Sequence, residues 1–220
     1  QPVTIGLNEN QDNLVMSRLY PNPATGNVRI IDAKGMHLTP GIVDEHSHIA
    51  LFSVNEGADA SSAEVRMSDV INPEDINIYR QLSGGVTTAQ LLHGSANPIG
   101  GQSCIIKLRW GKNADEFKFE NAPDFIKFAL GENVKHSNGT NPDQVRFPQT
   151  RMGVEQLYYD YFTRATAYKK QIADFGKLTP KQIETSKTAS PRRDLDLEAL
   201  AEIIAAPPSI FPVLSITKGK

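Results

Sequence analysis

The chain has 220 residues, with 23 Lys and Arg against 25 Asp and Glu, and a formal net charge of -2. This balance gives no sign of nucleic-acid binding or of docking on an anionic membrane. No apolar run approaches the roughly 20 residues that a membrane span needs. Cys104 is the only cysteine, which excludes an internal disulfide. The length allows one sizeable domain, or a domain with a small appendage.

The start of the chain gives an expectation about processing. Residue 1 is Gln rather than Met, and no charged-then-apolar signal segment opens the sequence. We therefore expect a soluble chain that is cut or processed at its start. The compartment stays open: periplasmic or secreted if a targeting segment has been removed, and cytoplasmic otherwise.

Predicted strands and helices alternate along the sequence after a polar stretch at residues 1–27 that is rich in turn-forming residues. Apolar alternation and β-branched runs predict strands at residues 28–32, 42–50, 86–92, 104–110 and 124–130. Helical spacing and start signals predict helices at residues 73–82, 153–175 and 194–205, and a Gly-rich loop at residues 94–102. Alternation of this kind favours a parallel sheet in an α/β fold.

The helix predicted at residues 153–175 has the clearest pattern. One stripe at helical spacing is apolar or aromatic, which predicts a face packed against the sheet. Its members are Val154, Leu157, Tyr158, Tyr161, Phe162, Ala165 and Tyr168.

Two histidines stand two residues apart in the first strong strand. Side chains alternate along a strand, so Asp44, His46 and His48 share one face. Imidazoles about 6–7 Å apart on one face can converge on a single divalent ion, and imidazole suits zinc. Two ligands do not complete a site, and an isolated pair of this spacing also arises by chance.

The context of the pair resembles a known family. Residues 38–48 read Leu-Thr-Pro-Gly-Ile-Val-Asp-Glu-His-Ser-His, similar to the P-G-hydrophobic-hydrophobic-D-x-H-x-H signature of the amidohydrolase superfamily. Gly-Gly-Val-Thr-Thr at residues 84–88 resembles that superfamily's entry to the second barrel strand. Segments 92–103, 125–135 and 146–153 resemble a bacterial, imidazolonepropionase-like branch. The resemblance covers about residues 28–204.

This resemblance implies a fold and its division. We expect an α/β chain that forms the N-terminal half of a (β/α)8 TIM-type barrel, with about four parallel strands plus helices. A complete barrel needs roughly 250 residues, so it does not fit here. The expected parts are an irregular segment with a remnant of a small β domain (1–38), a partial barrel (39–206) and a divergent tail (207–220).

The resemblance also implies a metal-dependent hydrolase of C–N bonds with one or two divalent ions, zinc by preference. His46 and His48 would be metal ligands. A bridging ligand would come from Lys127 as a carboxylated lysine, with Glu132 as the rival. His93 would contact substrate, or else be a hydrogen-bonded structural histidine.

Other expected parts of such a site are missing from the sequence. The family places further histidines on strands five and six and an aspartate base on strand eight, whereas no histidine follows His136 here. We therefore expect a truncated enzyme, with a catalytic base that cannot be assigned to a residue of this chain. Cys104 is predicted to pack rather than to act as a nucleophile.

Three functional alternatives follow. The first is an amidohydrolase acting on a small amide-type substrate, with homo-oligomerisation left open. The second is a non-catalytic half-barrel or binding module that needs another chain to complete it. The third is a complete α/β enzyme of another class that uses only His46, His48 and an acid.

Overall fold

The computed structural model describes residues 35–37, 39–135, 146–205 and 211–215. The chain divides into two compact units, Gln1–Pro40 and Gly41–Lys220. The fold described below is that of the second unit. The strand predicted at residues 28–32 and the side chain of His136 lie outside the described residues.

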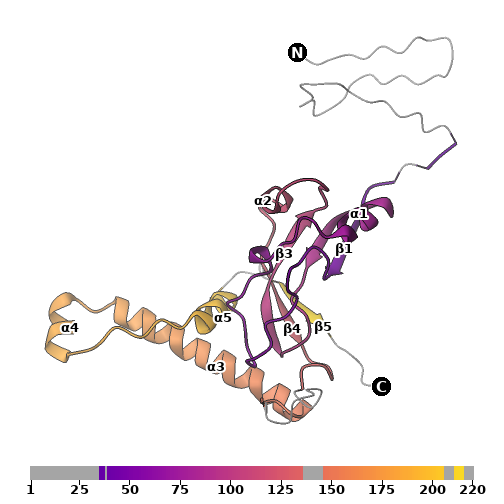
Figure 1. Cartoon of the computed structure of the whole chain (residues 1–220). Coiled ribbons are helices and arrows are strands. Elements are labelled where there is room, and N and C mark those ends of the chain that lie inside the picture. The colour runs from indigo at the N-terminus through magenta and orange to yellow at the C-terminus, as the bar shows by residue number, and fades with distance from the viewer. Residues whose placement is uncertain (1–34, 38, 136–145, 206–210, 216–220) are drawn as a thin grey trace, which may run out of the picture. The chain divides into compact units, whose positions relative to one another are not determined.

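A five-stranded sheet forms the body of the second unit, in the order β1-β2-β3-β4-β5 (Figure 1). The strands are β1 (Ile42–Ser47), β2 (Val86–Leu91), β3 (Ile99–Lys107), β4 (Phe125–Ala129) and β5 (Phe211–Ser215). β1 pairs with β2 and β4 pairs with β5 in parallel. The predicted α/β class and the strands at 42–50, 86–92 and 124–130 are confirmed, with shorter bounds.

The expectation that the strands all run parallel is wrong for β3. This strand is antiparallel to both β2 and β4. The physical reason is the short connection from Leu91 to Ile99, because a parallel crossover needs a dozen or more residues. Because β3 is antiparallel to both of its neighbours, the other four strands β1, β2, β4 and β5 run in the same direction. Their carboxyl ends therefore lie on the same side of the sheet.

β3 also begins earlier than predicted. Residues 99–102 were expected in a loop because of their glycines, but they belong to the strand. A Cβ added to Gly101 would lie 2.6 Å from a methyl of Val65 and 2.8 Å from its carbonyl oxygen. Glycine is therefore required here by close packing, although a glycine pair is more typical of turns.

The helices start at capping residues. They are α1 (Ile76–Ser83), α2 (Ala114–Phe117), α3 (Arg151–Gly176), α4 (Pro180–Ser186) and α5 (Leu195–Ala205), with a 3-10 turn at Met67–Asp69. Asp75 caps α1 by accepting from the Asn77 N–H at 3.0 Å, and its other oxygen accepts from Ala50 N–H at 2.7 Å. One aspartate thus joins the start of α1 to the segment that follows β1.

α3 and α5 pack on the strand pair β3–β4. Six residues of the predicted α3 stripe pack, buried or partly buried, in this layer with Ile126 and Phe128 of β4, and the seventh, Val154, is buried in a small cluster with Ala129 at the end of β4. Phe128 meets Tyr158 and Phe162 edge-on, with ring centroids 5.4 and 5.9 Å apart. The prediction that this stripe faces the sheet is confirmed.

Tyr158 fastens α3 to the end of β4. Its hydroxyl donates to the Pro98 carbonyl at 2.5 Å and accepts from Ala129 N–H at 3.1 Å. Burial raises the pKa of this phenol, so it stays protonated and can donate. We expect Tyr158→Phe to lower the free energy of unfolding by about 1–2 kcal/mol in urea titrations. Tyr159→Phe is the matched control, because Tyr159 is 65% exposed, and it should leave stability unchanged.

Candidate metal centre

His46 and His48 lie at the carboxyl end of β1. Their ring centroids are 5.3 Å apart and the rings are nearly perpendicular. Both residues are exposed, whereas Ser47 between them is buried. The Asp44 carboxylate accepts from the main-chain N–H of His46 at 3.2 Å, which supports this stretch of backbone. The structure therefore places the two imidazoles together, as their spacing predicts.

The orientation of His48 is set by the neighbouring strand. Its Nδ1 lies 2.8 Å from the Leu92 carbonyl oxygen. A carbonyl can only accept, so Nδ1 carries the proton and the lone pair of the neutral ring is on Nε2. Metal-binding histidines commonly have this arrangement, with one nitrogen bonded to a carbonyl and the other free for the ion.

Lys127 reaches the same place from β4. Its side chain is fully buried, and its Nζ lies 3.5 Å from His46 Nε2. These residues are 81 positions apart in the sequence, so the sheet alone brings them together. Of the two candidates for a bridging ligand, Lys127 is the one that the structure places beside His46.

The electrostatics of this cluster favour neutral groups. Burial lowers the pKa of the Lys127 amine. The pKa of His46 is lowered by burial first and then by the positive charges of Lys127 and His48. Neutral imidazole and neutral amine are the forms with a lone pair, so the cluster is suited to bind an electrophile or a metal ion.

The donor set fits a divalent metal ion, provided that the lysine counts as a ligand. Among the described residues, no group of three or more His, Cys, Asp and Glu side chains could hold a metal ion. The third group here is Lys127, a buried amine whose contact with His46 is at the outer limit of a hydrogen bond. His46, His48 and Lys127 are thus the residues that could hold a metal in this unit.

Glu132 lies in a different set of contacts. Its carboxylate forms ion pairs with Lys135 and, at 3.8 Å, with Arg151 at the start of α3. Both partners compete with a metal ion for the carboxylate. The assignment of Glu132 as a metal ligand stays a prediction, with Lys127 favoured by its contact.

His93 is fully buried where the chain leaves β2. Its Nδ1 lies 2.8 Å from the Gly94 carbonyl oxygen, and its Nε2 accepts from the Glu56 N–H at 2.7 Å. Burial lowers the pKa of this ring, which keeps it neutral. Both ring nitrogens are therefore bonded to main chain, an arrangement that favours the structural alternative, while a substrate contact stays a prediction.

Cys104 packs against the core cluster around Leu91 and Ile106. Burial raises the pKa of its thiol to about 12. Folded protein at pH 8 should therefore react with iodoacetamide far more slowly than protein in urea, where the thiol regains its ordinary pKa of about 8.5. Equal labelling rates by mass spectrometry would contradict this burial. The raised pKa of the thiol also means that stability falls as pH rises from about 9 towards 12, because the thiol of the unfolded chain loses its proton first.

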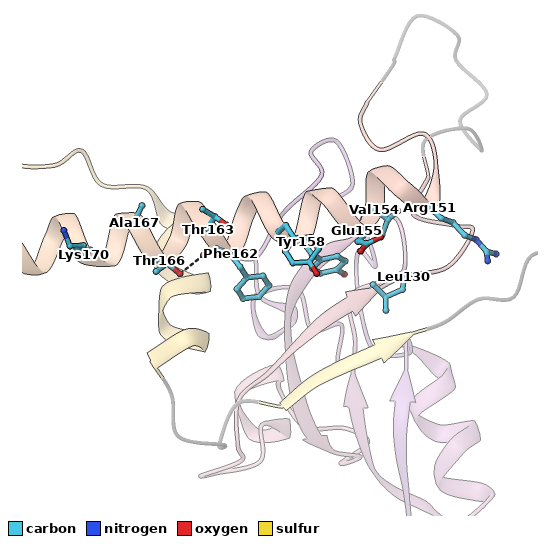
Figure 2. Close-up of a pocket in the computed structure, with 11 residues that line it drawn as sticks. Leu130, Arg151, Val154, Glu155, Tyr158, Phe162, Thr163, Thr166, Ala167 and Lys170 are labelled. Carbon is cyan, nitrogen blue, oxygen red and sulfur yellow. Dashed lines mark hydrogen bonds between the residues drawn. The ribbon is translucent and has the colours of Figure 1, made fainter.

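A large groove lies elsewhere in the unit. Its volume is about 1000 Å³, and its walls include Leu130, Tyr158, Phe162 and Lys170. Figure 2 shows that most of these side chains come from α3. None of the groups at the candidate metal centre lines this groove.

Sequence reasoning missed the backbone partners of the site. The Leu92 carbonyl and the Glu56 N–H fix His48 and His93, respectively. Main-chain groups carry no residue-specific signal, so no pattern could have identified them. Gly100 and Gly101 were visible in the sequence as part of a Gly-rich segment. The structure shows that neither position has room for a side chain, which composition could not indicate.

Two histidines and a buried lysine lie near the carboxyl ends of parallel strands of an α/β sheet, which is where barrel enzymes place their active sites. No family model matches the chain. The described residues contain no helix long and apolar enough to cross a membrane.

Two known proteins are similar to this chain. Amidohydrolase tasK of Hapsidospora irregularis is 33% identical over 188 residues, which is 77% of this chain and 18% of that protein. A solved amidohydrolase structure from Thermotoga maritima MSB8 is 32% identical with a TM-score of 0.64, over 86% of this chain and 48% of the other. The chain thus spans less than half of either relative. Both support the amidohydrolase family and an arrangement that matches part of an amidohydrolase barrel.

Proposed function

We propose that this chain carries the first metal-binding strand and the bridging lysine of a metal-dependent amidohydrolase that cleaves C–N bonds. The substrate would be a small molecule with an amide or cyclic amide group. The resemblance of segments 92–103 and 125–135 supports an imidazolonepropionase-like branch. The complete enzyme would draw its catalytic base from residues beyond those of the described site.

One observation carries this proposal. The buried Lys127 amine lies 3.5 Å from His46 Nε2. On the other side, the bond from His48 Nδ1 to the Leu92 carbonyl leaves the lone pair of His48 on Nε2. A buried lysine with no carboxylate partner among the described residues lowers stability, so its presence calls for a functional reason. Ligation at this cluster gives that function.

The chemistry of Lys127 is consistent with carboxylation. Burial lowers the pKa of its amine, which favours the neutral form that can attack the carbon of dissolved CO₂. As the new N–C bond forms, the electron pair of one C=O bond moves to its oxygen and a proton of the nitrogen passes to water, which gives an anionic carbamate. The two carbamate oxygens could then serve two cations, as the family resemblance implies for a bridging ligand.

The roles of the residues follow from their contacts. Bound divalent ions would supply Lewis-acid activation of water and of the scissile carbonyl. His46 and His48 would hold the ion at the end of β1, with His48 kept in its tautomer by the Leu92 carbonyl. Lys127, as its anionic carbamate, would offset the positive charge of the ions from β4.

Zinc binding by the purified chain tests the proposal. We expect stoichiometric zinc in the protein, measured by atomic absorption after dialysis. Zinc at a hundredfold excess over its dissociation constant should add about 2.7 kcal/mol to the free energy of unfolding. A chain that takes up no zinc at micromolar concentrations and gains no stability would refute the assignment.

A second candidate is a half-barrel that functions only when another chain completes it. β1 and β5 lie at the two edges of the sheet, and β1 leaves Ile42 and Val43 more than half exposed. An apolar edge strand is a ready site for pairing with another strand. Light scattering distinguishes the two: a monomer that unfolds cooperatively argues against this candidate, and a concentration-dependent oligomer supports it.

A further inference from the structure

The end of β2 contacts both halves of the candidate metal centre. The Leu92 carbonyl accepts from His48, which belongs to the β1 side of the site. The ring of the next residue, His93, lies against Gly100 of β3, as does the stem of Lys127. Two consecutive residues are thus placed between the ligands of one strand and the ligand of another.

The ring of His93 lies directly on β3. A Cβ added to Gly100 would be 2.8 Å from His93 Nδ1 and 3.3 Å from the Cβ of Lys127. The imidazole and the lysine stem therefore both occupy the space that a side chain of Gly100 would need. Ile99, the residue before Gly100, pairs with Phe128, the residue after Lys127, so β3 joins the contact of the His93 ring to the strand that carries the lysine.

The ring itself has little freedom to move. Glu56 N–H donates to Nε2 at 2.7 Å, and Nδ1 lies 2.8 Å from the Gly94 carbonyl. Gly94 N–H also donates to the Val54 carbonyl at 2.9 Å. These bonds fix the loop that follows the His46–His48 strand against the end of β2.

We propose that His93 is a positioning residue of the metal centre, which holds Lys127 in place through Gly100 and ties it to the loop after β1. This inference rests on the proposed function and names a residue that acts through Lys127. Positioning by groups outside the ligand set commonly affects metal affinity 10–100-fold. A substrate contact by His93 would instead leave metal affinity unchanged.

Two substitutions separate the bonds of the ring. His93→Asn keeps a donor near the position of Nδ1, and His93→Gln keeps an acceptor near the position of Nε2. We expect both variants to bind zinc 10–100-fold more weakly by competition with a chromophoric chelator. The visible spectrum of the cobalt-substituted protein should shift as well, which a purely structural role would not produce.

Ile106→Val is the matched control, because Ile106 is fully buried on β3 in the core cluster with Leu91 and Phe117, which includes neither His93 nor Lys127. It should lose about 1 kcal/mol of stability in urea and keep wild-type zinc affinity and cobalt spectrum. If the His93 variants do not fold, Gly100→Ala tests the same contact with His93 intact and should weaken zinc binding similarly.

The outcomes are distinct. Zinc affinity within twofold of wild type in a folded His93 or Gly100 variant overturns the inference and leaves the proposed function intact. A loss of affinity that Ile106→Val shares also overturns it. A wild-type chain that binds no zinc overturns both.

Discussion

Replacing His46 with alanine should remove stoichiometric zinc from the protein and weaken zinc binding by at least about 100-fold. This loss is larger than the 10–100-fold effect of residues that only hold the metal ligands in place. His46 is the histidine that faces the Lys127 amine, at 3.5 Å. Without its imidazole the site retains His48 and one lysine, fewer than the three protein ligands of most zinc sites. Atomic absorption and chelator competition measure the loss.

The control for this substitution is another histidine. His37 is exposed and lies outside the second unit, so His37→Ala should keep wild-type zinc content. Because His46 is itself exposed, His46→Ala should also leave the urea midpoint of the metal-free chain unchanged. Unchanged zinc content in the His46 variant would exclude metal ligation by the pair.

Local patterns predicted much of the fold. Alternation and β-branched runs predicted β1, β2 and β4, and the seven-residue stripe predicted α3, because each of these patterns lies within a single element. The direction of β3 was not predictable from alternation, since parallel and antiparallel strands have the same two-residue period. The length of the connection from Leu91 to Ile99 was the signal that could have corrected it.

The candidate site was predictable only in part. His46 and His48 are neighbours in the sequence, so a motif can identify them. Lys127 is 81 residues from His46, and the sequence favoured it only slightly over Glu132. The tertiary structure distinguishes the two candidates, because Lys127 lies beside His46 whereas Glu132 forms ion pairs with Lys135 and Arg151.

Lys127→Met should stabilise the metal-free chain while it impairs the site. Methionine is a similarly long, apolar side chain, and the lysine it replaces is fully buried without an acidic partner among the described residues. Removal of a buried polar group of this kind is expected to raise the free energy of unfolding by about 1–3 kcal/mol. Zinc content should fall by at least one equivalent, because the ligand from β4 is lost.

The carbamate gives a signal that belongs to Lys127 alone. Wild-type protein incubated with ¹³C-bicarbonate and zinc should show a carbamate carbon resonance, and Lys127→Met should lack it. Lys169→Met is the matched control, since Lys169 is exposed on α3, and it should retain the resonance, the zinc and the wild-type urea midpoint. Full zinc occupancy in Lys127→Met would show that His46 and His48 bind the metal without β4, and would move the bridging assignment back to Glu132.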